Sequence, residues 1–141
     1  MKRLLVATIA CFSSLVIFAQ NVELDITNLR NKKGHIQIMV FKDSASYKED
    51  KPISITCFSK KTMKDGGMKI FVKVPQGVFG VILHDDENDT KQMEYNILGF
   101  PKEGFGFAGY YHKGLRRPVF DDFKFLVGDE VVKKVIRVRC F

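Results

Sequence analysis

Residues 68–83 read MKIFVKVPQGVFGVIL, and this stretch decides the fold class. Apolar residues recur at every second position from Met68 to Val74 with lysines between them, which predicts a strand with one buried face. Pro75-Gln76-Gly77 predicts a turn, because proline presets its own φ and glycine closes the bend. The nearly unbroken apolar run Val78–Leu83 then predicts a central strand that is covered on both faces.

The same period of two recurs on both sides of this stretch. It predicts strands at residues 22–27, 36–40, 53–59, 123–127 and 131–140, whereas the only helix signal is a single turn near Tyr47. Asp65-Gly66 and Gly128-Asp129 are both predicted to form tight hairpin turns. About seven strands without a long helix predict an all-β fold, an antiparallel two-sheet β-sandwich with one long loop. Residues 20–141 are expected to form it as a single domain.

The first residues carry the pattern of an export signal. Lys2 and Arg3 precede an apolar run over residues 4–18, and Ala19 is a small residue at a plausible cleavage position. This pattern predicts a secretory signal peptide over residues 1–19 and a secreted or periplasmic protein. A lipoprotein anchored through Cys11 is the disfavoured alternative, because the residues before Cys11 form a poor lipidation box. No later apolar run is long enough to predict a transmembrane segment.

The charge of the chain is positive but dispersed. Its 141 residues carry a formal net charge of +7, with basic pairs such as Lys60-Lys61 and Arg116-Arg117 spread along the sequence. Dispersed pairs of this kind predict a solvated surface rather than a nucleic-acid interface, and export also argues against nucleic acid. The expected partner is an envelope or extracellular ligand, either a protein or a glycan.

Two cysteines lie beyond the predicted signal. Cys57 alternates with isoleucines, and Cys140 alternates with Ile136 and Val138, so both thiols are predicted to face an apolar interior. An oxidising compartment permits a disulfide between them, and the alternative is two separate buried thiols. The sequence leaves both open, because it does not say whether the two strands are neighbours.

The stretch His84–Gly109, HDDENDTKQMEYNILGFPKEGFGFAG, interrupts the strand pattern and is the predicted functional segment. Side chains with oxygen atoms occupy relative positions 1, 3, 5 and 9 of its acidic part, namely Asp86, Asn88, Thr90 and Glu94. Oxygen at every second residue of a tight loop is typical of calcium sites, with Asp85 as a substitute ligand. Lys91 and Ile97 stand where an EF-hand-type loop has glycine and glutamate. A solvated acidic turn is therefore the alternative.

The second half of this stretch is rich in glycine and aromatic residues. Gly104 and Gly106 are predicted to allow close approach of backbone. The rings could stack on a sugar or clamp a peptide, but we favour a role in pinning the loop onto the sandwich. The predicted ligand-binding residues are His84, Glu103, Phe105, Phe107 and Tyr110.

His84 lies beside two aspartates in the sequence. A histidine next to carboxylates suits a general base or a metal ligand, so a hydrolase using His84 with Asp85 or Asp86 is one alternative function. A structural histidine is favoured, since no serine or cysteine nucleophile lies in the same stretch. We therefore predict that the protein is not an enzyme and has no catalytic residue.

Five marks of the sequence resemble a secreted bacterial family known as domain of unknown function twenty-one forty-one. They are Gly34-His35-Ile36, the turn at residues 74–77, the run His84–Asn88, the motif Gly99-x-Pro101-x-Glu103-Gly104-x-Gly106-Phe107, and Pro118-x-Phe120-Asp121-Asp122. The resemblance implies export and a prealbumin-like or carboxypeptidase-regulatory-like sandwich, and it implies no established reaction. The acidic loop departs from the family pattern at Thr90 and Glu94.

Together these features predict a non-catalytic binding or accessory module outside the cytoplasm. Its working surface is expected to be residues 84–111, and calcium is the candidate ion for ordering this loop. A third alternative, beside the hydrolase, is a structural subunit of the cell envelope whose exposed edge strand pairs with a neighbour.

Overall fold

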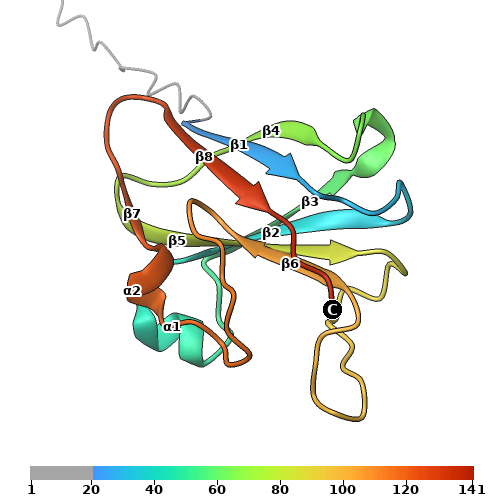
Figure 1. Ribbon diagram of the computed structural model, residues 1–141. Helices are drawn as coiled ribbons and strands as arrows, with labels where there is room; N and C mark the ends of the chain where they lie inside the picture. The colour runs from blue at the N-terminus through green and yellow to red at the C-terminus, as the bar shows by residue number, and fades with distance from the viewer. Residues whose placement is uncertain (1–20) are drawn as a thin grey trace, which may run out of the picture.

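The computed structural model describes residues 21–141, so the predicted signal peptide at 1–19, with Cys11, lies outside the described residues. The described chain forms two sheets (Figure 1). One sheet has three strands in the order β4-β1-β8, and the other has the order β3-β2-β5-β6, with β7 also pairing with β5. The prediction of an all-β, two-sheet sandwich is confirmed.

The strands are β1 (Val22–Thr27), β2 (His35–Phe41), β3 (Ser54–Ser59), β4 (Met68–Val72), β5 (Gly77–Asp86), β6 (Gly104–Phe107), β7 (Phe125–Val127) and β8 (Val132–Arg137). Two short helices, α1 (Ser44–Lys48) and α2 (Phe120–Phe123), and the 3₁₀ turn η1 (Lys60–Thr62) are the remaining elements. The strand pairs are antiparallel except β1 and β8, which run parallel. Within residues 21–141, no helix is long and apolar enough to cross a membrane.

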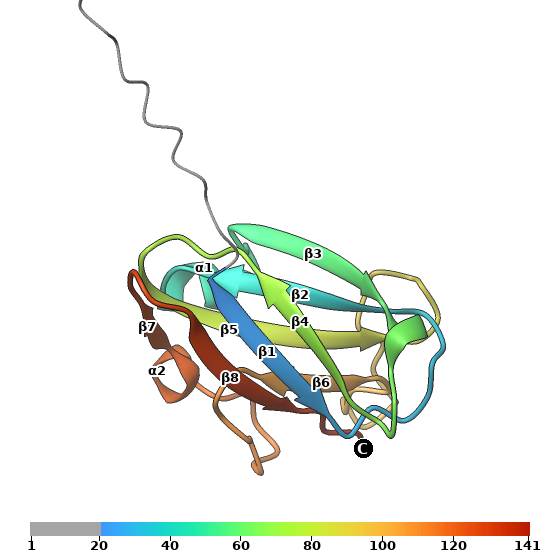
Figure 2. The ribbon, with the colours of Figure 1, turned by 90° about the horizontal axis from the view of Figure 1, so that it is seen from above.

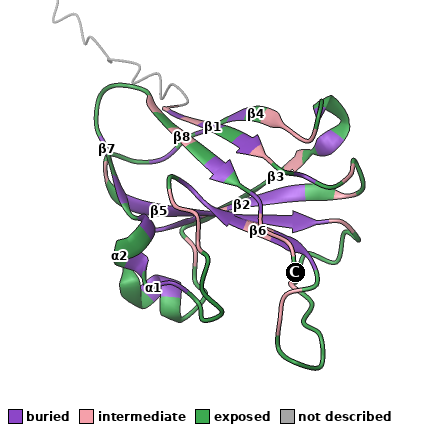
Figure 3. Cartoon of the chain, in the orientation of Figure 1, coloured by how far each residue is buried: buried purple, intermediate pink, exposed green. Residues whose placement is uncertain are grey.

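The main core lies between the two sheets, which are stacked face to face (Figure 2). Alternate residues of β1, namely Val22, Leu24 and Ile26, are fully buried there, as the period of two requires. β5 pairs with β2, β6 and β7, and most of its length is buried on both faces (Figure 3). The predicted central strand is therefore correct, and it extends through His84 and Asp85 to Asp86.

A second apolar cluster covers one end of the outer face of the five-stranded sheet. It contains Tyr47 from α1 and Phe120 and Phe123 from α2, packed against Phe41 and Phe107. A β-carbon at position 80 of β5 would lie 2.5 Å from the ring of Phe123, so glycine there allows α2 to approach the sheet. The helices leave the remainder of this outer face for the site described below.

The prediction that both thiols face the interior is wrong for Cys57. β3 is the edge strand of its sheet, and Ile55 and Cys57 lie exposed on it. Cys140 is half-buried and packs against the main core, as expected. Both thiols are free, so the disulfide alternative does not hold. The isoleucines near Cys57 mark an exposed apolar edge instead of a buried face.

Three local predictions also need comment. Asp65-Gly66 is a tight turn as predicted, with φ values of 53° and 74°. Gly128-Asp129 is not a hairpin turn, because β7 pairs with β5 and β8 pairs with β1, so this connection carries the chain from one sheet to the other. The strand expected from residue 123 begins at Phe125, after α2.

β6 was missed, because it lies inside the segment interpreted as loop. A β-carbon at Gly104 would lie 2.6 Å from Cγ1 of Val138, and one at Gly106 would lie 2.5 Å from Cγ2 of Ile136. Glycine therefore occupies the buried positions of this strand, where an apolar side chain would be the usual signal.

Candidate functional site

The site begins with three consecutive polar residues at the end of β5. His84, Asp85 and Asp86 are only 3%, 0% and 2% exposed. Side chains alternate along a strand, so His84 and Asp86 share the outer face of the five-stranded sheet while Asp85 points towards the inside of the sandwich. Buried polar groups need partners, and the two faces provide different ones.

On the inner side, the partner of Asp85 is a lysine. Nζ of Lys60 lies 2.5 Å from Oδ1 of Asp85, and both side chains are fully buried. Burial raises the pKa of the Asp85 carboxyl, and Lys60 acts in the opposite direction. Oδ2 of Asp85 has no hydrogen-bond partner within residues 21–141. This pair corrects the interpretation of Lys60-Lys61 as a solvated pair, because only Lys61 is exposed.

On the outer side, His84 meets Glu103. Nε2 of His84 lies 3.2 Å from Oε1 of Glu103, and the Glu103 side chain is buried just before β6. The backbone N–H of Glu87 donates to Oε2 of Glu103 at 2.8 Å. Glu103 therefore ties the acidic loop to the sheet, and His84 contacts this glutamate instead of the neighbouring aspartates of the hydrolase hypothesis.

Asp86 completes a cluster with these two side chains. Its Oδ1 accepts from the backbone N–H of Thr90 at 3.1 Å, and its Oδ2 accepts from that of Lys91 at 2.8 Å. One ligand atom from each of His84, Asp86 and Glu103 can be chosen so that all three lie within 4.8 Å of one another. His84 and Asp86 are two positions apart in the sequence, whereas Glu103 follows Asp86 by 17 positions.

The structure brings the predicted calcium ligands together. Oγ1 of Thr90 lies 2.9 Å from Oδ1 of Asn88 and donates to the Gln92 carbonyl at 3.0 Å. Nδ2 of Asn88 donates to Oε1 of Glu94 at 3.0 Å. With Asp86 bonded to the Thr90 N–H, these oxygens line one side of a compact turn.

The two departures from an EF-hand-type loop have different structural outcomes. Lys91, at the position of the usual glycine, adopts φ of 61°, so the backbone takes the conformation for which glycine is normally selected. Ile97 is fully exposed and supplies no ligand. Glu103 is a carboxylate from outside the acidic loop that lies in one cluster with Asp86.

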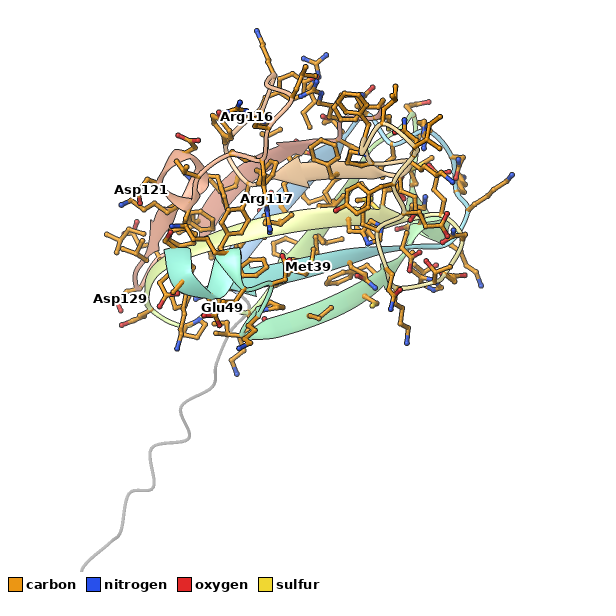
Figure 4. The ribbon with its side chains drawn as sticks, turned by 90° about the horizontal axis from the view of Figure 1, so that it is seen from below. Met39, Glu49, Arg116, Arg117, Asp121 and Asp129 are labelled. Atoms are coloured by element: carbon orange, nitrogen blue, oxygen red, sulfur yellow. The ribbon has the colours of Figure 1, made fainter. Side chains whose placement is uncertain are left out.

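A groove of about 790 Å³ crosses the outer face of the five-stranded sheet beyond α1 and α2. Its floor includes Met39 of β2, Ile82 of β5, and Phe105 and Phe107 of β6, and His84 continues this floor along β5 towards the acidic loop. Residues from 91–101 form one wall and residues from 112–118 form the other. Figure 4 shows Met39 on this face of the sheet and Arg116 and Arg117 at its margin.

Of the aromatic residues predicted to bind a ligand, Phe107 pins the loop onto the sheet and Phe105 lines the groove. Phe107 is buried and packs against Phe123, with ring centroids 4.9 Å apart, which is the pinning role that we favoured. Phe105 is half-buried in the groove floor and stacks on Phe141. Tyr110 packs on the edge of Phe107 and does not line this groove.

The rim of the groove is cationic. Arg117 stacks 3.9 Å above the Tyr47 ring and donates to Asp50 at 2.8 Å, so it is held in place. Arg116 and Lys91 are exposed on opposite walls, and within residues 21–141 neither side chain makes an ion pair. Lys60, Met39 and Arg116 were not predicted as site residues, because a lysine pair, a strand methionine and a loop arginine carry no local signal of a site.

The comparisons with known proteins give one result. A family model described as an uncharacterized protein conserved in bacteria (DUF2141) matches residues 24–134. This range contains His84, Asp86, Glu103 and the acidic loop. No curated protein and no solved structure matches the chain.

Proposed function

Because the chain belongs to the bacterial family DUF2141, which is described only as uncharacterized, we propose its function from the geometry. The protein is a non-catalytic binding module, and its outer groove takes a ligand that carries an apolar group next to an anionic one. The observation that carries this proposal is a groove with an apolar floor and, on each wall, a cation that makes no ion pair within residues 21–141. Mostly apolar concave sites with a few placed polar groups are typical of ligand binding.

The floor and the rim select different parts of such a ligand. Met39 and Phe105 are half-buried, so part of their apolar surface is open to the groove. Covering it would be favourable by about 25 cal/mol per Å² of apolar area removed from water. Arg116 and Lys91 supply positive charge at the margins. An aromatic or aliphatic group beside a carboxylate or phosphate fits this arrangement, whether it belongs to an envelope protein or to a glycan.

Calcium is the ion that we propose to order one wall of the groove. Support comes from Asn88, Thr90 and the Gln92 carbonyl, whose oxygens lie about one hydrogen-bond length apart. Calcium prefers oxygen ligands and tolerates irregular geometry. The groove wall formed by residues from 91–101 begins next to Thr90 and includes Gln92, so an ion here would fix the wall on which Lys91 lies.

Export of the protein is the remaining part of the proposal. It rests on the sequence pattern of residues 1–19. An exported module would meet millimolar calcium, the concentration range in which extracellular calcium modules bind. The working location would then be the periplasm or the cell exterior.

The groove is tested with an anionic apolar dye, anilinonaphthalene sulfonate. The purified protein should enhance its fluorescence, and Met39→Glu should weaken binding at least tenfold by placing an acid in the floor. Leu126→Glu is the matched control, since Leu126 is exposed on β7 and does not line the groove. Equal binding by wild type and Met39→Glu would overturn the groove as the binding surface.

Calcium is tested by thermal unfolding. Millimolar calcium should raise the Tm of the wild type, and a chelator should reverse the rise. Asn88→Ala and Glu94→Ala should lose the rise, whereas Asp121→Ala, which removes an exposed acid from α2, should keep it. If no rise occurs, or if it survives in Asn88→Ala, the calcium proposal fails.

A further inference from the structure

We propose that His84, Asp86 and Glu103 form a site for a divalent transition-metal ion, distinct from the calcium loop. The site would lie where the groove floor reaches the end of β5. This inference goes beyond the proposed function, because it concerns a different class of ion and adds His84 and Glu103 as ligands, with Asp86 common to both predicted ligand sets.

The strand geometry places the three side chains together. His84 and Asp86 are two residues apart on β5 and so point to the same side. Asp85 pairs with Gly104 across the β5–β6 ladder, which places Glu103 next to the end of β5. One ligand atom from each lies within 4.8 Å of the others. Bonds of about 2.0–2.2 Å to a common ion require ligand atoms closer than this, so small rotations of the side chains would close the site.

The charges in this cluster are unbalanced. Asp86 and Glu103 are 2% and 5% exposed, and within residues 21–141 their carboxylates are bonded to backbone N–H groups and to His84. The nearby cations are used elsewhere, since Lys60 pairs with Asp85 and Arg30 pairs with Glu87. Two buried carboxylates without a lysine or arginine partner are costly. A divalent ion would neutralise them at the point where they converge.

The donor set indicates the class of ion. One imidazole nitrogen with two carboxylates suits Zn²⁺, Mn²⁺ or Fe²⁺ better than calcium, which prefers oxygen alone. Backbone N–H groups hold both carboxylates in orientation and leave lone pairs on their oxygens.

The groove gives the site an opening. His84 lines it, together with Phe105 and Ile82. Three protein ligands leave at least one coordination position for water or an exogenous group, as in metal sites with an open position. An anionic group in the groove could fill that position, and this link alone rests on the proposed function.

The test uses the purified protein freed of metal with a chelator and then titrated with Zn²⁺ by calorimetry. We expect one Zn²⁺ per chain, with affinity reduced at least tenfold in His84→Gln and in Glu103→Gln. His112→Gln is the matched control, because His112 lies in the groove wall outside the cluster, and it should bind as the wild type does. No binding by the wild type, or equal binding by His84→Gln, would overturn the site.

Two further measurements separate the proposals and guard against misfolding. Asn88→Ala should lose the calcium-induced rise in Tm and keep Zn²⁺ binding, whereas His84→Gln should show the opposite. If His84→Gln does not fold, histidine ring ¹⁵N signals of the wild type decide the matter. Zn²⁺ should shift those of His84, and a shift confined to His35 or His112 would overturn the site.

Discussion

The adjacent carboxylates Asp85 and Asp86 lie on opposite sides of β5 and have different bonding partners. Asp85 on the inner side meets a lysine that is as deeply buried as itself. Asp86 on the outer side, with Glu103 next to it, receives only backbone N–H groups and a histidine. Asp85 has its own cation inside the fold, although its Oδ2 accepts no hydrogen bond within residues 21–141. A buried acid without its own cation is a place where a cation can be added, so the difference distinguishes a structural pair from a candidate site.

The comparison also gives each side a mechanical role. The Lys60–Asp85 pair joins the turn after β3 to β5 inside the sandwich. Glu103 joins the acidic loop to the sheet through the N–H of Glu87. The first contact should therefore govern the stability of the whole domain, and the second should govern the order of one loop.

The largest expected effect is on the inner side. Lys60→Met would leave the Asp85 carboxyl buried without a cation and should lower the free energy of unfolding by about 3–5 kcal/mol. Urea unfolding followed by circular dichroism measures this change. Lys61→Met at the exposed neighbouring position should stay within about 0.5 kcal/mol of wild type.

A second substitution tests whether the inner loss comes from the unpaired acid. Asp85→Leu in the Lys60→Met background should recover part of the stability, since it removes the buried charge. If Lys60→Met and Lys61→Met unfold with the same free energy, the inner pair does not stabilise the fold and the comparison fails.

The next effect concerns the backbone that fixes the outer side. Gly34 has φ of 67°, and a β-carbon there would lie 2.0 Å from the carbonyl oxygen of Asp86. Gly34→Ala should therefore cost about 2–3 kcal/mol, measured by the same urea unfolding. The strain of positive φ and the steric overlap both contribute.

Two other glycines separate these contributions. Gly99 has φ of 82° but open space around it, so Gly99→Ala should cost about 1 kcal/mol from strain alone. Gly128 has neither positive φ nor a neighbour within 4 Å, and Gly128→Ala should be nearly neutral. Equal losses at Gly34 and Gly99 would mean that the approach of Gly34 to Asp86 does not fix the outer side.

The fold was largely predictable because its buried faces alternate regularly. The patterns around β1, β2, β4 and β5 are formed by apolar side chains that all meet in one core. The prediction failed where the residue pattern did not reflect which side chains are buried. Ile55 of β3 is apolar but lies exposed on the edge of its sheet. Gly104 and Gly106 occupy the buried positions of β6, where they contribute no apolar side chain to the pattern.

The candidate site was only partly predictable, for a topological reason. The acidic loop and His84 are local in sequence, so their residue types alone suggested calcium and a metal ligand. The meeting of Glu103 with Asp86 depends on the pairing of β5 with a strand that the sequence did not reveal. Lys60 resembles Lys61 in sequence, and only the packing of the turn after β3 makes one buried and the other exposed.

A smaller effect is expected from Glu103 itself. Glu103→Ala removes the shorter of the two hydrogen bonds of the Glu87 N–H, the other being to the Asp85 carbonyl at 3.1 Å, and should lower stability by about 1–2 kcal/mol, measured with a chelator present. Hydrogen exchange should show faster exchange at the Glu87 amide and little change in β1. Glu130→Ala, at an exposed position outside the acidic loop, is the control. Unchanged protection of the Glu87 amide in Glu103→Ala would show that the loop is held by other contacts.

The smallest effect leaves stability unchanged and reports on the packing beside the inner pair. Cys57 is exposed on the edge strand, whereas Cys140 is half-buried and burial raises its pKa. The thiolate is the reactive form, so a raised pKa lowers the reactive fraction of Cys140 at a given pH. Iodoacetamide with peptide mapping should therefore label Cys57 first, and labelling of Cys140 should rise only at higher pH. Equal rates at neutral pH would mean that the C-terminal segment opens readily from the sandwich, and the inner side would then be less closed than the buried Lys60–Asp85 contact implies.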